Sequence, residues 1–144
     1  MDKRIVKFIK DHHVLTLATS SNNLAYCCNV YYVYNDQNNF LIFSSDISTK
    51  HVKEFIQNPN VAGAIHLETK AIEKIQGVQL LGTISELNGE ELDTSKTLYL
   101  DNFPYAKRMQ LHLWKMKLEF IKMTNNQIGF GKKLIWEETD LGKN

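Results

Sequence analysis

The chain has 144 residues, with 17 Lys and Arg against 16 Asp and Glu, and its formal net charge is therefore +1. This length suits one domain with a hydrophobic core, and the near-neutral balance provides no overall field that would recruit nucleic acid or an anionic membrane. The start of the chain lacks the apolar core of a signal peptide, and polar residues interrupt every apolar run before membrane-spanning length. We therefore expect a cytoplasmic protein that binds neither nucleic acid nor a membrane.

The first half of the chain predicts two helices with an antiparallel β-meander between them. Ile5, Phe8 and Ile9 recur at helical spacing, which predicts an opening helix. Helical spacing resumes at Val52 and stops at Asn58, because the residue before a proline is pushed out of the α region. Between the helices, runs of β-branched and aromatic residues separated by polar turns predict strands at 14–19, 24–34 and 40–45.

The second half predicts three further strands around a helical insertion. The strands fall at 61–67, 78–87 and 114–120, and a charged helical pattern broken by a proline occupies 89–113. Large apolar residues alternate with charged ones from Trp114 to Phe120, which predicts one buried and one wet face. Gly77 and Gly82 indicate a bulge or the close approach of another backbone or a ligand.

This order of elements predicts the fold class. About six strands with short helices between them favour a mainly β fold with flanking helices, a small antiparallel barrel rather than a βαβ sheet. A further segment at 128–136 ends the ordered chain. We expect a single domain over residues 1–138 and a polar C-terminal tail over 139–144.

A candidate anion site lies where the third strand runs into the second helix. Ser48, Thr49 and Lys50 stand at the expected helix start, where free N–H groups, the helix dipole, two hydroxyls and one ammonium group can meet a phosphate. The alternative is an ordinary Ser or Thr helix cap followed by a surface lysine. These residues alone do not decide between the two.

Other catalytic signatures are absent from the sequence. The five histidines have no metal-ligand spacing, and we therefore expect no metal site. The Gly129–Lys133 segment lacks the spacing of a Walker motif. Cys27 and Cys28 are neighbours on one strand, where their side chains point to opposite faces and cannot readily form a disulfide. A free thiol there is either an inert side chain or a nucleophile that needs a nearby base.

Several separated motifs occur in a characteristic order. They are Cys27-x-Asn29, Phe43-Ser44-Ser45, Ser48-Thr49-Lys50, Asn58-Pro59-Asn60-Val61, Gly77-Val78-Gln79, Leu87-x-Gly89-Glu90-Glu91, Phe103-Pro104 and Ile128-Gly129-Phe130-Gly131-Lys132-Lys133-x-Ile135-Trp136. Together they resemble the pyridoxamine 5′-phosphate oxidase-like, FMN-binding split-barrel superfamily, and more narrowly its YhbP-like branch. The resemblance implies a six-stranded antiparallel split β-barrel and a homodimer that holds two FMN molecules between its subunits.

The resemblance also implies roles for individual residues. Along the flavin ring and ribityl chain it places Cys28, Asn29, Val30, Tyr31, Phe43 and Ser44; near the ring it places Gly77 and Gln79; and around the phosphate it places Ser48, Thr49 and Lys50. The oxidase proper has an Arg-Lys pair where this chain has Thr49-Lys50, so one phosphate charge is missing. Lys132 or Lys133 could restore that charge. Trp136 either covers the cofactor, from its own or the other subunit, or packs at a subunit interface.

Three functions follow as hypotheses. The first is an FMN-dependent oxidoreductase or flavin reductase acting on a small substrate, in which the flavin carries the redox chemistry and no acid–base pair is required. The second is a non-enzymatic binder or store of FMN, haem or another planar cofactor. The third is a barrel without a ligand that serves as a dimeric partner protein, because one fold hosts several functions.

Overall fold

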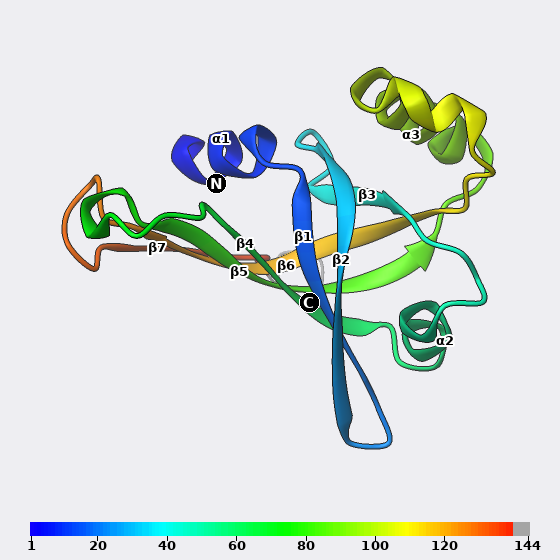
Figure 1. The fold of residues 1–144 in the computed structure, drawn as a ribbon, viewed down its shortest axis with the longest axis horizontal. Helices are drawn as coiled ribbons and strands as arrows, with labels where there is room; N and C mark the ends of the chain where they lie inside the picture. Colours follow the sequence, from blue (N-terminus) through cyan, green and yellow to red (C-terminus); the bar gives the residue numbers. More distant parts are fainter. Residues whose placement is uncertain (140–144) are drawn as a thin grey trace.

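The computed structural model of the chain describes residues 1–139, and it forms one antiparallel sheet with helices packed around it (Figure 1). The strands are β1 (Val14–Ser21), β2 (Leu24–Asn35), β3 (Phe40–Ser44), β4 (Asn60–His66), β5 (Gln76–Glu86), β6 (Leu113–Asn125) and β7 (Lys133–Glu137). The helices are α1 (Lys3–Asp11), α2 (Lys50–Gln57) and α3 (Gly89–Asn102), with short 3₁₀ turns at Ile72–Lys74 and Pro104–Arg108.

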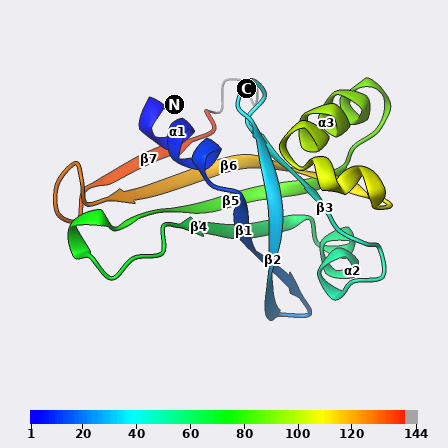
Figure 2. The ribbon, with the colours of Figure 1, turned by 45° about the horizontal axis from the view of Figure 1, so that its top comes forward.

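Strand pairing explains how the barrel closes and why it is split. The sheet order is β3-β2-β1-β4-β5-β6-β7, and an additional pairing of β3 with β6 closes the first six strands into a ring. Along one edge of β6, the stretch up to Lys117 pairs with β3, and the stretch from Phe120 pairs with β7. β6 therefore parts from the ring near its middle and carries β7 beyond it, as Figure 2 shows.

Inward side chains of all six ring strands form the main core, and α1 adds three more. Ile5, Phe8 and Ile9 of α1 are buried in this core, as the helical spacing predicted. The helix begins at Asp2, whose carboxylate accepts a 2.8 Å hydrogen bond from the N–H of Arg4 and satisfies one free donor of the first turn. Val52 and Phe55 attach α2 to the same core.

A second core lies outside the barrel, beneath α3. Val33 of β2 and Ile42 of β3 point outward there and pack against Tyr99 of α3. The helical insertion therefore covers one part of the outer sheet surface, and it breaks at Pro104 as predicted.

The outward side chains of β1, β2, β4 and β5 beyond α3 form a surface that no other part of the described chain covers. We call this the bare surface. Along its middle the side chains are small, and they are Thr16, Ala18, Ala25, Cys27, Ala62 and Ala64. Larger exposed residues border them, among them Leu81 at 51% exposure and Tyr31 at 52%. These small side chains project little from the sheet along the middle of the bare surface.

Two local features differ from the sequence prediction. The structure has seven strands rather than six, because part of the 128–136 segment becomes β7, while residues 128–132 form a turn. The pairing of β5 with β6 shifts at Gly82, so that Leu118 points into the core and Phe120 turns outward instead of continuing the buried row.

Gly82 confirms the bulge that its position in a strand predicted. A Cβ atom there would lie 2.3 Å from the carbonyl oxygen of Lys117, which only a glycine avoids. The expected polar tail at 139–144 lies outside the described residues apart from Thr139.

Candidate functional site

The turn between β3 and α2 is built around Asp46. Its Oδ1 accepts hydrogen bonds from the backbone N–H of Ser48 at 2.7 Å and from the Ser48 hydroxyl at 2.6 Å. These bonds from Ser48 lower the pKa of the Asp46 carboxyl below its ordinary value. The Thr49 hydroxyl donates to the Asp46 carbonyl at 2.7 Å. Both predicted hydroxyl donors are thus engaged within the turn, beside a carboxylate of the chain itself.

Lys50 begins α2, where it contacts two side chains and borders a hollow. Its Nζ lies 2.9 Å from Glu54 Oε1, an ionic contact between a lysine that is 63% exposed and a carboxylate that is 9% exposed. The same ammonium group lies 5.1 Å from the centre of the Tyr26 ring. A hollow of about 350 Å³ opens beside it. The hollow is lined by Ser21, Asn22, Leu24, Ala25, Tyr26, Lys50 and Glu54.

His51 fixes this turn to the barrel, a role that the sequence did not reveal. Its Nε2 lies 2.7 Å from the Oγ of buried Ser45, whose carbonyl accepts a 3.0 Å hydrogen bond from the Trp114 indole N–H. Burial lowers the pKa of His51 below its ordinary value of 6.5, because the protonated ring is poorly solvated there. The contact between His51 and Ser45 thus ties the first turn of α2, which carries Lys50, to the end of β3.

Asn29 and Gln79 lie in one row across the bare surface. Strand pairing aligns Asn29 with Thr16, Thr16 with Ala64, and Ala64 with Gln79. Strand spacing places the ends of this row about 14 Å apart. The Thr16 hydroxyl donates to Asn29 Oδ1 at 2.8 Å and holds that amide in place. Two polar side chains therefore border a floor of small residues about as wide as a fused ring system.

Two hollows on this surface lie on either side of the row. One, of about 500 Å³, runs from Ala18 and Ala25 to Leu81 and shares Ala25 with the hollow beside Lys50. The other, of about 330 Å³, contains both Gly77 and Gln79. The structure thus places Asn29, Tyr31, Gly77 and Gln79 on the bare surface, with Lys50 at its border.

Four predicted residues point away from the bare surface. Val30 and Phe43 are buried in the main core, where Phe43 packs edge-to-face against Phe55 with ring centres 6.1 Å apart. Cys28 and Trp136 are partly buried against the same core. Any contact of Val30 or Phe43 with a cofactor would have to come from the backbone.

The two cysteines are free and differ in their surroundings. Cys27 is exposed on the bare surface, and Cys28 is half-buried. Burial, and then the neighbouring Cys27, raise the pKa of the Cys28 thiol, which disfavours the reactive thiolate. Ser44 lies elsewhere, at the end of β3 opposite Leu113, and its Oγ accepts a 3.4 Å hydrogen bond from the N–H of His112.

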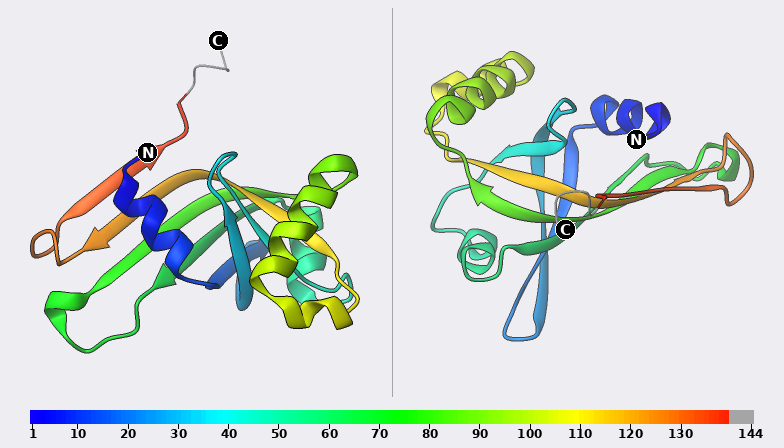
Figure 3. Two further views of the ribbon diagram at one scale, coloured as in Figure 1. Left: turned by 90° about the horizontal axis from the view of Figure 1, so that it is seen from above. Right: turned by 180° about the vertical axis from the view of Figure 1, so that it is seen from behind.

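Lys132 lies in the turn between β6 and β7, at the opposite end of the sheet from α2 (Figure 3). This turn is held rigidly, since Lys132 N–H donates to the Gly129 carbonyl at 2.9 Å and Gly131 N–H donates to Asn126 Oδ1 at 3.0 Å. Phe130 stands at its tip, 83% exposed. Within one chain the structure does not bring Lys132 to Lys50.

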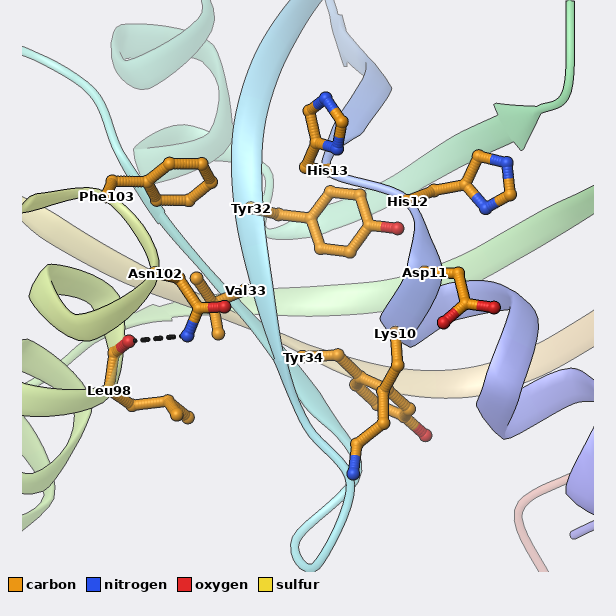
Figure 4. Close-up of a pocket in the computed structure, with 10 residues that line it drawn as sticks. All are labelled: Lys10, Asp11, His12, His13, Tyr32, Val33, Tyr34, Leu98, Asn102 and Phe103. Carbon is orange, nitrogen blue, oxygen red and sulfur yellow. Dashed lines mark hydrogen bonds between the residues drawn. The ribbon is translucent and has the colours of Figure 1, made fainter.

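A separate pocket of about 440 Å³ lies between α1, β2 and α3 and contains none of the predicted site residues (Figure 4). Most of its polar groups are already paired: the Tyr32 hydroxyl donates to the Ile9 carbonyl at 2.6 Å, and Asn102 Nδ2 donates to the Leu98 carbonyl at 2.9 Å. Lys10 forms a 2.9 Å ion pair with Asp36. The pocket offers few free donors, so we assign it no ligand.

Within residues 1–139, no three His, Cys, Asp or Glu side chains come together in a way that could hold a metal ion. None of the helices in that range is long and apolar enough to cross a bilayer.

Comparison with known proteins identifies the family. No model of a known protein family matches the chain. A UPF0306 protein from Yersinia pseudotuberculosis serotype O:3 is 36% identical over 136 residues, which cover 94% of this chain and 92% of that protein. UPF0306 proteins from Yersinia pestis match at the same identity. The chain belongs to the UPF0306 family.

Solved structures show that this UPF0306 protein shares the fold of pyridoxamine 5′-phosphate oxidase-like split barrels. A heme-binding protein from Mycobacterium smegmatis matches with a TM-score of 0.77 at 18% identity, and the chain covers 55% of its length. A FAD-binding protein from Mesorhizobium loti matches with a TM-score of 0.72 at 15% sequence identity, and the match covers 93% of that protein. A NimC/NimA family protein from Clostridium acetobutylicum matches with a TM-score of 0.71 at 20% identity, and the match covers 91% of that protein. A Listeria innocua protein named after pyridoxamine 5′-phosphate oxidase matches with a TM-score of 0.71 at 14% identity.

Proposed function

We propose that this UPF0306 protein, as a member of the YhbP-like branch, binds FMN and acts as an oxidoreductase of the flavin-reductase type on a small substrate. The observation that carries this proposal is the bare surface. A flat floor of small side chains lies between Asn29 and Gln79, and it connects through Ala25 to the hollow beside Lys50. The heme-binding and FAD-binding proteins of the same fold also bind planar groups.

The residues fit a flavin ring better than they fit its phosphate. Thr16 and Ala64 leave room for a ring to lie flat, and the amides of Asn29 and Gln79 can hydrogen-bond to its edges. Lys50 and the free N–H groups of the first turn of α2 provide donors for a phosphate. Glu54 competes with that phosphate for Lys50, and Asp46 already accepts from the Ser48 N–H and hydroxyl beside this turn. We expect FMN to bind with modest affinity.

The chain's own residues would bind and orient the cofactor rather than react. When bound, the flavin supplies hydride or electron transfer, and the protein supplies its position and surroundings. The Thr16 hydroxyl fixes the Asn29 amide, and His51 fixes the turn that carries Lys50. The bare surface excludes water from one side of a ring that lies on it.

A homodimer is part of the proposal. The large exposed side chains that border the bare surface, Leu81 and Tyr31, are of the kind that subunit interfaces bury. In the dimer that we propose, the two-fold axis lies in the plane of the bare surface and at right angles to the long direction of the sheet. Such an axis would bring the Phe130–Lys132 turn of each subunit beside α2 of its partner. Lys132 of one subunit would then supply the second cation near Lys50 of the other. The free cysteines suit a reducing compartment, and we place the protein in the cytoplasm.

The first experiment tests the cofactor. Protein purified without added flavin should be yellow, mass spectrometry of the released ligand should identify FMN, and NAD(P)H should bleach the colour under anaerobic conditions. A colourless protein that also fails to bind added FMN would contradict the proposal. Bound FMN that no pyridine nucleotide reduces would favour a store over an enzyme.

One observation favours a binder of haem or another planar cofactor as the second candidate. The His66 side chain is exposed and lines the hollow that contains Gln79, so an imidazole is available beside the floor. Haem titration separates the candidates, since a Soret shift that His66→Ala abolishes would indicate axial ligation.

Mixed dimers test the contribution of the partner. Lys50→Ala and Lys132→Ala should each weaken FMN binding. Mixing and reassembling the two variants should restore about a quarter of the wild-type sites, because half of the dimers are mixed and each mixed dimer has one intact site of two. No recovery, or a monomer by sedimentation, would contradict the shared site.

A further inference from the structure

Gly77 lines a hollow at the end of β4 and β5, where a larger residue would be crowded by the neighbouring strand. Gly77 lies opposite His66 in the strand pair, and a Cβ atom at residue 77 would lie 3.2 Å from the Ile65 carbonyl oxygen and 3.4 Å from His66 Cβ. The hollow has a volume of about 330 Å³, close to the lower limit for pockets that bind small molecules. A ligand here would be the size of one substituted ring.

The polar side chains around this hollow are hydrogen-bond donors or cations. The exposed His66 and Gln79 line it, together with Thr124 of β6. Lys133 of β7 pairs with Thr124, and its Nζ donates to Thr124 Oγ1 at 2.8 Å, which holds the ammonium group at the border of the hollow. No Asp or Glu lines the hollow. An anion would therefore meet donors and a positive charge here, without a competing carboxylate in the lining.

The remaining walls are apolar. Leu67 and Ile75 line the side toward the β4–β5 loop and are 37% and 38% exposed, and Ala64 lines the opposite side. A wholly polar anion such as phosphate would leave these side chains uncovered, whereas a ligand with an apolar body would bury them. The lining therefore suits a molecule with one anionic end and one apolar end.

We propose that this hollow binds a small amphipathic carboxylate, such as an aromatic acid, with its carboxylate toward Thr124 and Lys133 and its apolar body against Leu67 and Ile75. Gln79 borders both this hollow and the row that leads to Asn29. A ligand in the hollow therefore lies next to the proposed cofactor position. That this carboxylate is the substrate rests on the proposed function. Its binding in the hollow does not.

Benzoate is the probe for this site, and benzyl alcohol is its neutral counterpart. In ¹H–¹⁵N NMR titrations of the full chain, we expect benzoate to shift the backbone amides of His66, Gly77 and Thr124, and benzyl alcohol to shift them far less. Lys133→Gln and Thr124→Val should each weaken benzoate binding by about tenfold. The first removes the ammonium group, and the second removes the hydroxyl that holds this group at the border of the hollow. Lys74→Gln, an exposed lysine of the neighbouring loop that does not line the hollow, is the matched control and should leave binding unchanged.

The outcomes separate this inference from the proposed function. Benzoate binding at these residues with or without FMN supports the inference, even if the protein proves to bind no flavin. The inference is overturned if benzoate shifts no amide of the hollow, if benzyl alcohol binds equally well, or if Lys133→Gln and Lys74→Gln weaken binding alike. Adding FMN to the same samples tests the cofactor independently.

Discussion

The outer surface of the sheet has two regions, and the size of their side chains differs. Under α3 the outward residues are large, such as Val33, Phe40 and Ile42, and they form the second core. On the bare surface they are small, such as Ala18, Ala62 and Ala64. The strand β2 crosses both regions, with Val33 at one end and Ala25 at the other.

This difference indicates what covers each region. Large side chains stabilise the fold only where other side chains pack against them, and α3 provides that packing. Small side chains contribute little burial, and they let a flat object approach the backbone closely. Within residues 1–139 the chain covers one region itself, and the proposed function assigns the other region to a flavin and a second subunit.

The largest effect on stability is expected under α3. Ile42 is fully buried, and Ile42→Ala should lower the free energy of unfolding by about 2–4 kcal/mol through lost burial and a cavity. Urea denaturation followed by circular dichroism measures it. A change below about 1 kcal/mol would mean that this region is not a true core.

The largest effect on binding is expected on the bare surface. Ala64→Arg places a long charged side chain on the floor between Asn29 and Gln79 and should weaken FMN binding by at least about tenfold, with a stability change of only about 0.5 kcal/mol. Ser85→Arg, at an exposed position of β5 beyond this floor, is the control and should bind FMN normally. Equal affinity for both variants would place the cofactor elsewhere.

A smaller effect is expected at Lys50, on the border of the bare surface. Lys50→Ala should weaken FMN binding by about fivefold and leave riboflavin binding unchanged, because only FMN has the phosphate. Lys53→Ala, on the same helix, is the matched control. Glu54→Gln should strengthen FMN binding by about threefold, since it releases Lys50 from its ion pair. Isothermal titration measures the affinity of all three variants, and equal losses for FMN and riboflavin in Lys50→Ala would rule out a phosphate contact.

The smallest effect is a pH dependence at His51. Its pKa is lowered in the folded protein, so the unfolded chain takes up the proton first and stability falls as pH drops below about 6.5. We expect His51→Gln to lose less stability than the wild type between pH 7.5 and pH 5.5, measured as the urea midpoint. The same loss in both proteins would show that another group controls this range.

Much of the fold was predictable from local patterns. The spacing of Ile5, Phe8 and Ile9 predicted α1, and the alternation after Trp114 predicted β6. Phe120 was assigned to the wrong face because a bulge reverses the alternation, and a bulge depends on the register with the neighbouring strand. The glycine at residue 82 was the only local sign of it.

The candidate site was less predictable. The motifs drew attention to Lys50 and Gln79, and both lie at the bare surface or its border. They also drew attention to Phe43 and Trp136, which pack against the core, because a motif does not show which way a side chain points. The roles of these residues in binding stay predictions. His66 and Thr124 were missed, since each is an ordinary strand residue until the sheet places it beside Gly77.

The sequence by itself determined the order and kind of the helices and of the first six strands, because these depend on periodicity and turn residues within a few positions of each other. Only the tertiary structure decided which small residues share one surface, that Glu54 competes for Lys50, and that Lys132 lies at the opposite end of the sheet. These are consequences of strand pairing between segments far apart in the chain. The physical reason is that burial and charge pairing are properties of neighbours in space, which local patterns do not specify.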